Sequence, residues 1–184
     1  MHQNVLRPEK SVLLIIDVQE AFRQSIADFG EIARRTAVFA QGAQLLNIPI
    51  LVTEQYPKGL GRTIAEIMEV LTNETEIFEK TAFSSCGANA FVEHLEKIGA
   101  RQIIVAGIEA HVCVNQTVHD LLAQGFQTHL LTDCISSRAA ENKQIGLAKM
   151  QASGAILSSV EMALFELMRD SRHEQFKAIQ KLIK

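Results

Sequence analysis

The sequence predicts an α/β protein in which helices cover both faces of a mostly parallel β-sheet. Short apolar runs alternate about six times with longer segments of helical periodicity, which is the pattern of successive βαβ units. The first of these runs, residues 11–18, is apolar up to Asp17, as expected of a strand buried on both faces. The chain has 184 residues, of which 47% are hydrophobic, and shows no linker, so we expect a single domain over residues 1–184.

Six segments are expected to be strands because they are short, apolar and bounded by turn-forming residues: residues 11–18, 49–53, 76–80, 102–107, 127–132 and 155–158. The remaining segments place apolar side chains at helical spacing and are expected to be helices: residues 31–46, 63–71, 88–98, 112–124, 139–153, 160–168 and 173–183. Pro57, Gly59 and Gly61 interrupt residues 55–62, so we expect an irregular loop there.

Composition argues against several classes of protein. The chain has 18 basic and 21 acidic residues, a net charge of -3, so it lacks the basic excess of a nucleic-acid-binding domain. No apolar run approaches the ~20 residues of a membrane-spanning helix, and residues 1–11 lack the apolar segment of a secretory signal. Cys86, Cys113 and Cys134 are an odd number without paired spacing, which argues against a disulfide framework. We therefore expect a cytoplasmic protein with neither nucleic acid nor a membrane as its partner.

Chemically useful side chains follow three of the predicted strands. Asp17 ends the first strand, Lys80 ends the third, and Cys113 follows the fourth at the start of a predicted helix. In open parallel sheets, ligands bind at the carboxyl ends of the strands. A carboxylate, an ammonium and a thiol are therefore expected to gather at one edge of the sheet.

Each of these residues has two interpretations. Cys113 is either a nucleophile whose pKa is lowered at the helix start, or a small apolar residue packed there. Asp17 and Lys80 are either a general base with its charged partner, or a structural ion pair at the sheet edge.

The motifs around these residues resemble the isochorismatase-like cysteine hydrolases. The resemblance covers about residues 11–159 and rests on three motifs in the same order: Asp17-Val18-Gln19 with Phe22, Glu79-Lys80 with Phe83, and Gly-Ile-Glu-Ala-His-Val-Cys-Val at residues 107–114. The stretch 133–137 also fits. Residues 53–57, 59–61 and 175–184 look closest to the isochorismatase-domain-containing subgroup.

The resemblance implies a three-layer αβα Rossmann-like fold with a six-stranded parallel sheet of order 3-2-1-4-5-6. It implies that Asp17 is the general base, Lys80 its electrostatic partner and Cys113 the nucleophile, which would cleave a small amide or related acyl substrate through a thioester. The backbone N–H groups of Glu109 and Cys113 would hold the oxyanion, and a cis peptide bond is expected between Ile108 and Glu109.

Further expectations concern the surroundings of this site. Five side chains adjoin the motifs or the loop at residues 55–62 and are predicted to line the substrate pocket: Gln19, Phe22, Gln55, Tyr56 and Phe83. His111 is expected to be a bystander or a contact between subunits. Members of the family are commonly dimeric or larger, so a homo-oligomer is expected.

Two departures from the family narrow the prediction. Its nicotinamidases carry metal-binding histidines after the second strand, whereas residues 54–63 here have none, so no metal is expected. No strand is followed by a GxGxxG motif and a helix, so no dinucleotide cofactor is expected either. True isochorismatases lack the cysteine and cleave a vinyl ether, and Cys113 argues against that assignment. Two alternatives stay open: a catalytically silent interaction protein and an isochorismatase-type enzyme that cleaves C–O bonds.

Overall fold

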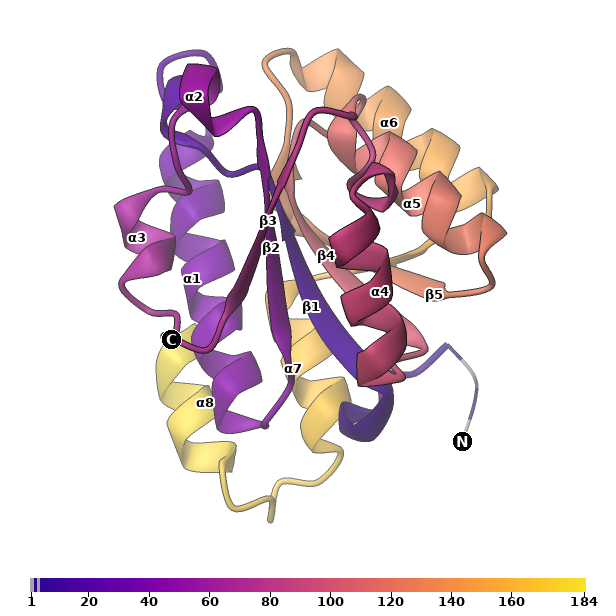
Figure 1. Cartoon of the computed structure of the whole chain (residues 1–184). Helices are drawn as coiled ribbons and strands as arrows, with labels where there is room; N and C mark the ends of the chain where they lie inside the picture. The colour runs from indigo at the N-terminus through magenta and orange to yellow at the C-terminus, as the bar shows by residue number, and fades with distance from the viewer. Residues whose placement is uncertain (1, 3) are drawn as a thin grey trace.

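A computed structural model describes residues 2 and 4–184, and it has the predicted α/β architecture (Figure 1). Six parallel strands form one sheet in the order β3-β2-β1-β4-β5-β6, which confirms the predicted topology. The strands are β1 (Ser11–Ile16), β2 (Ile50–Gln55), β3 (Glu76–Lys80), β4 (Gln102–Ile108), β5 (Gln127–Ser136) and β6 (Ile156–Ser158).

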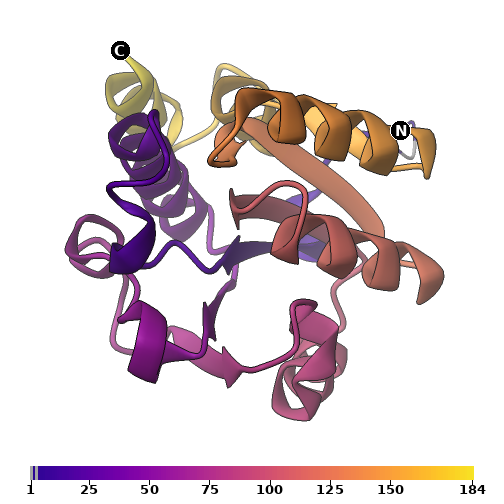
Figure 2. The same ribbon diagram turned by 90° about the horizontal axis from the view of Figure 1, so that it is seen from above.

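Helices cover both faces of the sheet, as the view from above makes clear (Figure 2). One face carries α1 (Phe29–Leu45), α3 (Ala65–Met68), α7 (Val160–Met168) and α8 (Phe176–Ile183). The other face carries α4 (Asn89–Ile98), α5 (Cys113–Ala123) and α6 (Ala140–Ala152). Short helical turns occupy the connections: η1 (Pro8–Lys10), η2 (Glu20–Phe22), α2 (Pro57–Leu60) and η3 (Ser85–Gly87).

The strand register brings the carboxyl ends of three strands together. Ile16 of β1 pairs with Thr53 of β2 on one side and with Gly107 of β4 on the other. Asp17 follows directly, and its N–H donates to the Thr53 carbonyl at 3.0 Å. Asp17 has a φ of 53°, so the chain leaves the sheet there and β1 ends two residues earlier than predicted. This turn sets the Asp17 side chain at the junction of three strands.

Gly107 permits the close contact between β1 and β4 at this edge. Its φ is 135°, and a Cβ atom on it would lie 2.1 Å from the carbonyl oxygen of Ile16. Any side chain would therefore force β1 and β4 apart next to Asp17.

Besides the early end of β1, three predicted segments differ from the structure. The helix expected over residues 63–71 covers only Ala65–Met68. Residues 57–60 form the helical turn α2, so the prediction of an irregular loop was wrong there. The Tyr56 carbonyl accepts hydrogen bonds from the N–H groups of Gly59 and Leu60, and Gly61, at a φ of 76°, ends the turn. Strand β5 continues to Ser136, beyond its predicted end at residue 132, because it pairs with β4 again after a bulge at residues 105–107.

The C-terminal helix α8 packs on its own chain. Ile179 is fully buried in the same apolar cluster as α1, and Phe176 and Ile183 pack against that cluster. Among the helices formed by residues 2 and 4–184, none is both long and apolar enough to cross a membrane.

Candidate active site

A buried ion pair lies at the carboxyl edge of the sheet. Asp17 is 1% exposed and Lys80 is 5% exposed, and the Lys80 ammonium donates to Oδ2 of Asp17 at 2.6 Å. The same ammonium also lies within reach of Gln55 Oε1 at 2.8 Å and of the carbonyl oxygens of Phe83 at 2.9 Å and Ala82 at 3.3 Å. Four acceptors therefore surround three N–H bonds, and these contacts hold the charge in place.

The second oxygen of the Asp17 carboxylate has its own donor. Oδ1 accepts a hydrogen bond from the Thr53 hydroxyl at 2.9 Å. Burial raises the pKa of Asp17, while the charge of Lys80 and hydrogen bonds from Lys80, Cys113 and Thr53 lower it; the net shift is upward. The carboxylate is thus a better proton acceptor than an exposed aspartate.

Cys113 is the first residue of α5, and its side chain meets this ion pair. The residue is 7% exposed, and its thiol is close enough to the Asp17 carboxylate and the Lys80 ammonium for both groups to shift its pKa. Burial and the negative charge of Asp17 raise the pKa of the Cys113 thiol to about 12. This shift is opposite to the lowering expected from the helix start, because desolvation and the adjacent carboxylate disfavour the thiolate. At rest the sulfur therefore keeps its proton beside a carboxylate that can accept it.

The turn between β4 and Cys113 has an unusual backbone. The peptide bond between Ile108 and Glu109 is cis. The Glu109 carboxylate is almost completely buried, and its Oε1 accepts from the Arg138 backbone N–H and from Arg138 Nε, both at 3.0 Å. The N–H of Cys113 lies in the first turn of α5, where backbone donors have no partner within the helix.

Gln19 and Gln55 make their contacts within the protein. Gln19 is fully buried; its Nε2 donates to the carbonyl oxygens of Gln55 at 3.0 Å and Gly61 at 2.6 Å, and its Oε1 accepts from the Gln55 N–H at 2.8 Å. The Gln55 side chain joins Lys80 to the Thr81 carbonyl. Gln19 therefore fastens both ends of the segment that contains α2, and Gln55 steadies the ammonium.

The three predicted aromatic residues lie in different surroundings. Phe22 is half-buried and packs against the apolar cluster on the α1 face. Tyr56 and Phe83 are more than half exposed, at 54% and 53%. Tyr56 and Lys80 both line a cavity of about 390 Å³, together with Pro57, Lys58, Glu79, Thr81, Gly87 and Ala88. Lys80 belongs to both the cavity lining and the ion pair, whereas Asp17 and Cys113 are not among the residues that line this cavity.

Other residues have roles that the sequence did not indicate or left open. Ser85 and Thr117 are fully buried and hydrogen-bonded to one another, and Ser85 also lies 3.4 Å from the Thr53 hydroxyl. Hydroxyl groups 32 residues apart carry no local signal of such a contact. His111 lies 3.0 Å from the Ser137 hydroxyl, and Cys134 is buried in the core on the α1 face.

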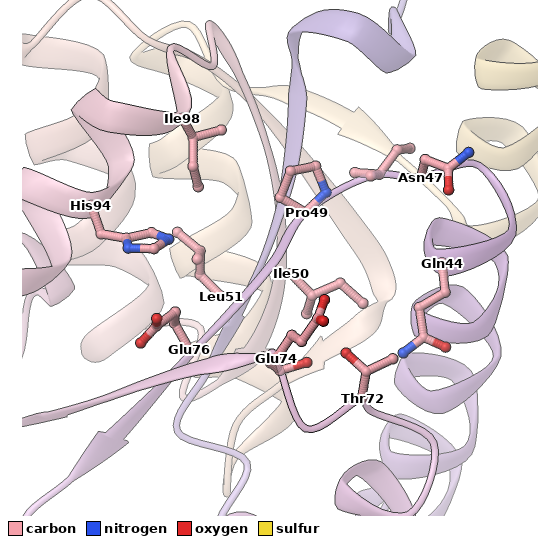
Figure 3. Close-up of a pocket in the computed structure, with 12 residues that line it drawn as sticks. Gln44, Asn47, Pro49, Ile50, Leu51, Thr72, Glu74, Glu76, His94 and Ile98 are labelled. Carbon is pink, nitrogen blue, oxygen red and sulfur yellow. The ribbon is translucent and has the colours of Figure 1, made fainter.

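A second cavity of about 390 Å³ lies at the opposite edge of the sheet, where β2 and β3 begin (Figure 3). Glu74, Glu76 and His94 line it with apolar residues such as Pro49 and Ile98. None of the predicted site residues borders it. Across residues 2 and 4–184, no group of three or more His, Cys, Asp or Glu side chains is arranged to hold a metal ion.

Comparisons with known proteins identify the family. Residues 11–162 match the family described as Isochorismatase domain. The chain is 41% identical over 179 residues to Isochorismatase domain-containing protein 1 of Salmo salar, a match that covers 97% of this chain but only 62% of that relative's length. The chain therefore belongs to the isochorismatase family. The similarity also supports the domain-containing subgroup suggested by the sequence.

Two structures share the fold along almost the whole chain. MAR1 ribonuclease from Caenorhabditis elegans is 41% identical, with a TM-score of 0.93 over 97% of this chain and 92% of that one. YcaC from Pseudomonas aeruginosa, with hexane-2,5-diol and covalent acrylamide, is 25% identical, with a TM-score of 0.91 over 99% and 93% of the two chains. This chain thus has the fold of an isochorismatase-family hydrolase.

Proposed function

We propose that this chain is a cysteine hydrolase that cleaves the C–N bond of a small amide, or a related acyl bond, through a thioester on Cys113. One observation carries the proposal: the buried Cys113 thiol lies within the electrostatic influence of both members of a buried ion pair, Asp17 and Lys80, at the carboxyl edge of a parallel sheet. A structural ion pair needs no thiol beside it, whereas acyl transfer needs a nucleophile next to a base.

The proposed reaction has two halves. The Asp17 carboxylate takes the thiol proton while the Cys113 sulfur attacks the substrate carbonyl carbon. The C–N bond then breaks, the leaving amine takes the proton from Asp17, and a thioester remains. Water next attacks the thioester and gives a proton to Asp17. The C–S bond breaks, the acid leaves, and the sulfur recovers its proton.

Lys80 and the backbone support this sequence of charges. The fixed ammonium stabilises both the Asp17 carboxylate and the thiolate as each forms. The N–H groups of Glu109 and Cys113 are the proposed donors to the oxyanion, and removing one such donor would cost about 10²–10³ in rate. None of these steps calls for a metal ion or an organic cofactor.

Tyr56 and Phe83 are the proposed walls of the substrate pocket because both rings are exposed and belong to segments that contact Lys80. Gln19, Phe22 and Gln55 are proposed to support that pocket. A small molecule fits the cavity of about 390 Å³ that Tyr56 and Lys80 line. A cytoplasmic homo-oligomer that acts on such a molecule remains part of the proposal.

The test uses a library of small amides, with release of ammonia or amine as the first measurement. Cys113→Ala is expected to abolish release, whereas Cys86→Ala, the matched loss of a thiol outside the ion pair, should retain it. Intact-protein mass spectrometry during turnover should detect an acyl group on the wild type and none on Cys113→Ala. Release of ammonia or amine that survives Cys113→Ala would overturn the thioester on Cys113.

Ribonuclease activity is the second candidate, because the Caenorhabditis elegans relative is named a ribonuclease. The net charge of -3 gives little attraction to a phosphate backbone. The discriminating measurement is cleavage of labelled RNA by the wild type and by Cys113→Ala. Cleavage that Cys113→Ala retains, without amide turnover by the wild type, would favour the ribonuclease. Neither activity in a folded protein would favour a silent interaction protein.

A further inference from the structure

Three buried hydroxyl groups form a chain that ends on the proposed base. The Thr53 hydroxyl donates to Asp17 Oδ1 at 2.9 Å, and the Ser85 hydroxyl lies 3.4 Å from the Thr53 hydroxyl. The Thr117 hydroxyl donates to the Ser85 hydroxyl at 3.2 Å, and the Ser85 backbone N–H donates back to the Thr117 oxygen at 2.9 Å. Thr53, Ser85 and Thr117 are all completely buried.

The hydrogen-bond directions in this chain follow from proton counting. An ionised carboxylate only accepts hydrogen bonds, so the Thr53 hydroxyl must donate its single proton to the hydrogen bond with Asp17. Thr53 then accepts from Ser85, and Ser85 accepts from Thr117. Every hydroxyl therefore points its proton toward the Asp17 carboxylate, an arrangement in which successive hydrogen bonds reinforce one another. A proton on Oδ1 of Asp17 would oppose this direction.

The chain also joins the elements that carry the site. Thr53 belongs to β2, which pairs with β3 and thus with Lys80. Ser85 begins η3, five residues after Lys80. Thr117 lies four residues after Cys113 on α5, so the two residues share one face of that helix. The hydroxyl chain thus links the carboxylate to the helix that presents the thiol.

We propose that Thr53, Ser85 and Thr117 are positioning residues that orient the Asp17 carboxylate toward Cys113 and keep it a proton acceptor. This role rests on the proposed function, because only that function makes Asp17 the base for Cys113. The hydroxyl chain itself is testable without any substrate.

The test is a ¹³C NMR titration of the Asp17 carboxyl group in the full chain, assigned by comparison with Asp17→Asn. Thr53→Val removes the donor at nearly constant shape and is expected to raise the pKa of Asp17 by about one unit, because the ionised form loses a hydrogen bond. Thr53→Ser restores the hydroxyl and should return the pKa of Asp17 toward the wild-type value. Equal pKa values in Thr53→Val and the wild type would overturn the role of Thr53.

Ser85→Ala tests the next link of the chain. It is expected to raise the pKa of Asp17 in the same direction by a smaller amount, since Ser85 acts through Thr53. An unchanged pKa in Ser85→Ala would overturn the chain beyond Thr53. Thermal unfolding of each variant confirms that the titrating protein is folded. Because the titration needs no turnover, inactivity of the wild type toward amides would refute the proposed function and leave this result standing.

Discussion

Lys80 and Asp17 form a hydrogen-bonded ion pair of 2.6 Å whose side chains are 0% and 1% exposed. Each charge stabilises the other, because both side chains are buried and water cannot solvate them. Removing one partner leaves the other as an isolated buried charge, which is far more costly than removing both. The pair therefore couples the stability of the fold to the chemistry of the proposed site.

Lys80→Met is expected to destabilise the protein by about 3–5 kcal/mol, because Asp17 loses its counter-charge. The double variant Lys80→Met/Asp17→Asn should recover part of that loss, since no uncompensated charge remains. Urea unfolding of the wild type, both single variants and the double variant measures the coupling. Strict additivity of the two single effects would contradict an energetic link between the residues.

Asp17→Asn is expected to reduce turnover by about 10²–10⁴-fold, because the amide cannot accept the thiol proton. The same change should lower the pKa of the Cys113 thiol, since the carboxylate helps to raise it. Turnover with a small amide and the pH dependence of Cys113 alkylation test the two effects separately. A thiol pKa that stays at the wild-type value would mean that Asp17 does not act on the sulfur.

The lowered pKa of the buried His129 predicts that the protein loses stability in mild acid. Burial lowers its pKa from 6.5 to about 4, so the folded protein binds fewer protons at this site than the unfolded chain between those pH values. Stability should therefore fall as the pH drops from 6.5 to about 4, by about 3 kcal/mol in total. His129→Gln cannot titrate, and its unfolding free energy should lack this component. Parallel losses in both proteins would assign the acid sensitivity to other groups.

Gly107→Ala is expected to destabilise the protein by about 3 kcal/mol or more, because the new Cβ meets the Ile16 carbonyl oxygen and the φ is positive. Gly30→Ala is the matched control, since a Cβ at this position in the first turn of α1 meets nothing within 4 Å. That control should gain about 0.5–1 kcal/mol from reduced chain entropy. Equal unfolding midpoints for the two variants would refute the steric argument.

The sequence predicted the sheet and the place where the reactive groups gather, because both follow from local patterns. Apolar runs identify parallel strands, and residues that end such strands meet at one edge, which is how Asp17 and Lys80 could be placed together. The left-handed turn at Asp17 carries no comparable signal, and it shortens β1. Gln19 follows that turn, and its contacts with Gln55 and Gly61 depend on the folded path of a distant loop.

The hydroxyl groups around Asp17 escaped prediction for a similar reason. Thr53, Ser85 and Thr117 come from a strand, a short turn and a helix, and only the tertiary structure brings them into line. The raised pKa of Cys113 also depends on tertiary neighbours, because the helix start alone would lower it.

The contacts of Lys80 imply that the residue that supplies the positive charge is not the residue that selects the ligand. Its ammonium already has an acceptor for every proton before any ligand arrives. A ligand could reach that charge only by displacing Gln55 or a main-chain oxygen. Under the proposed function, selectivity among substrates would then come from Tyr56, Pro57 and Lys58 in the cavity lining, and changes at these three residues are expected to alter the preferred substrate while Asp17, Lys80 and Cys113 keep their contacts.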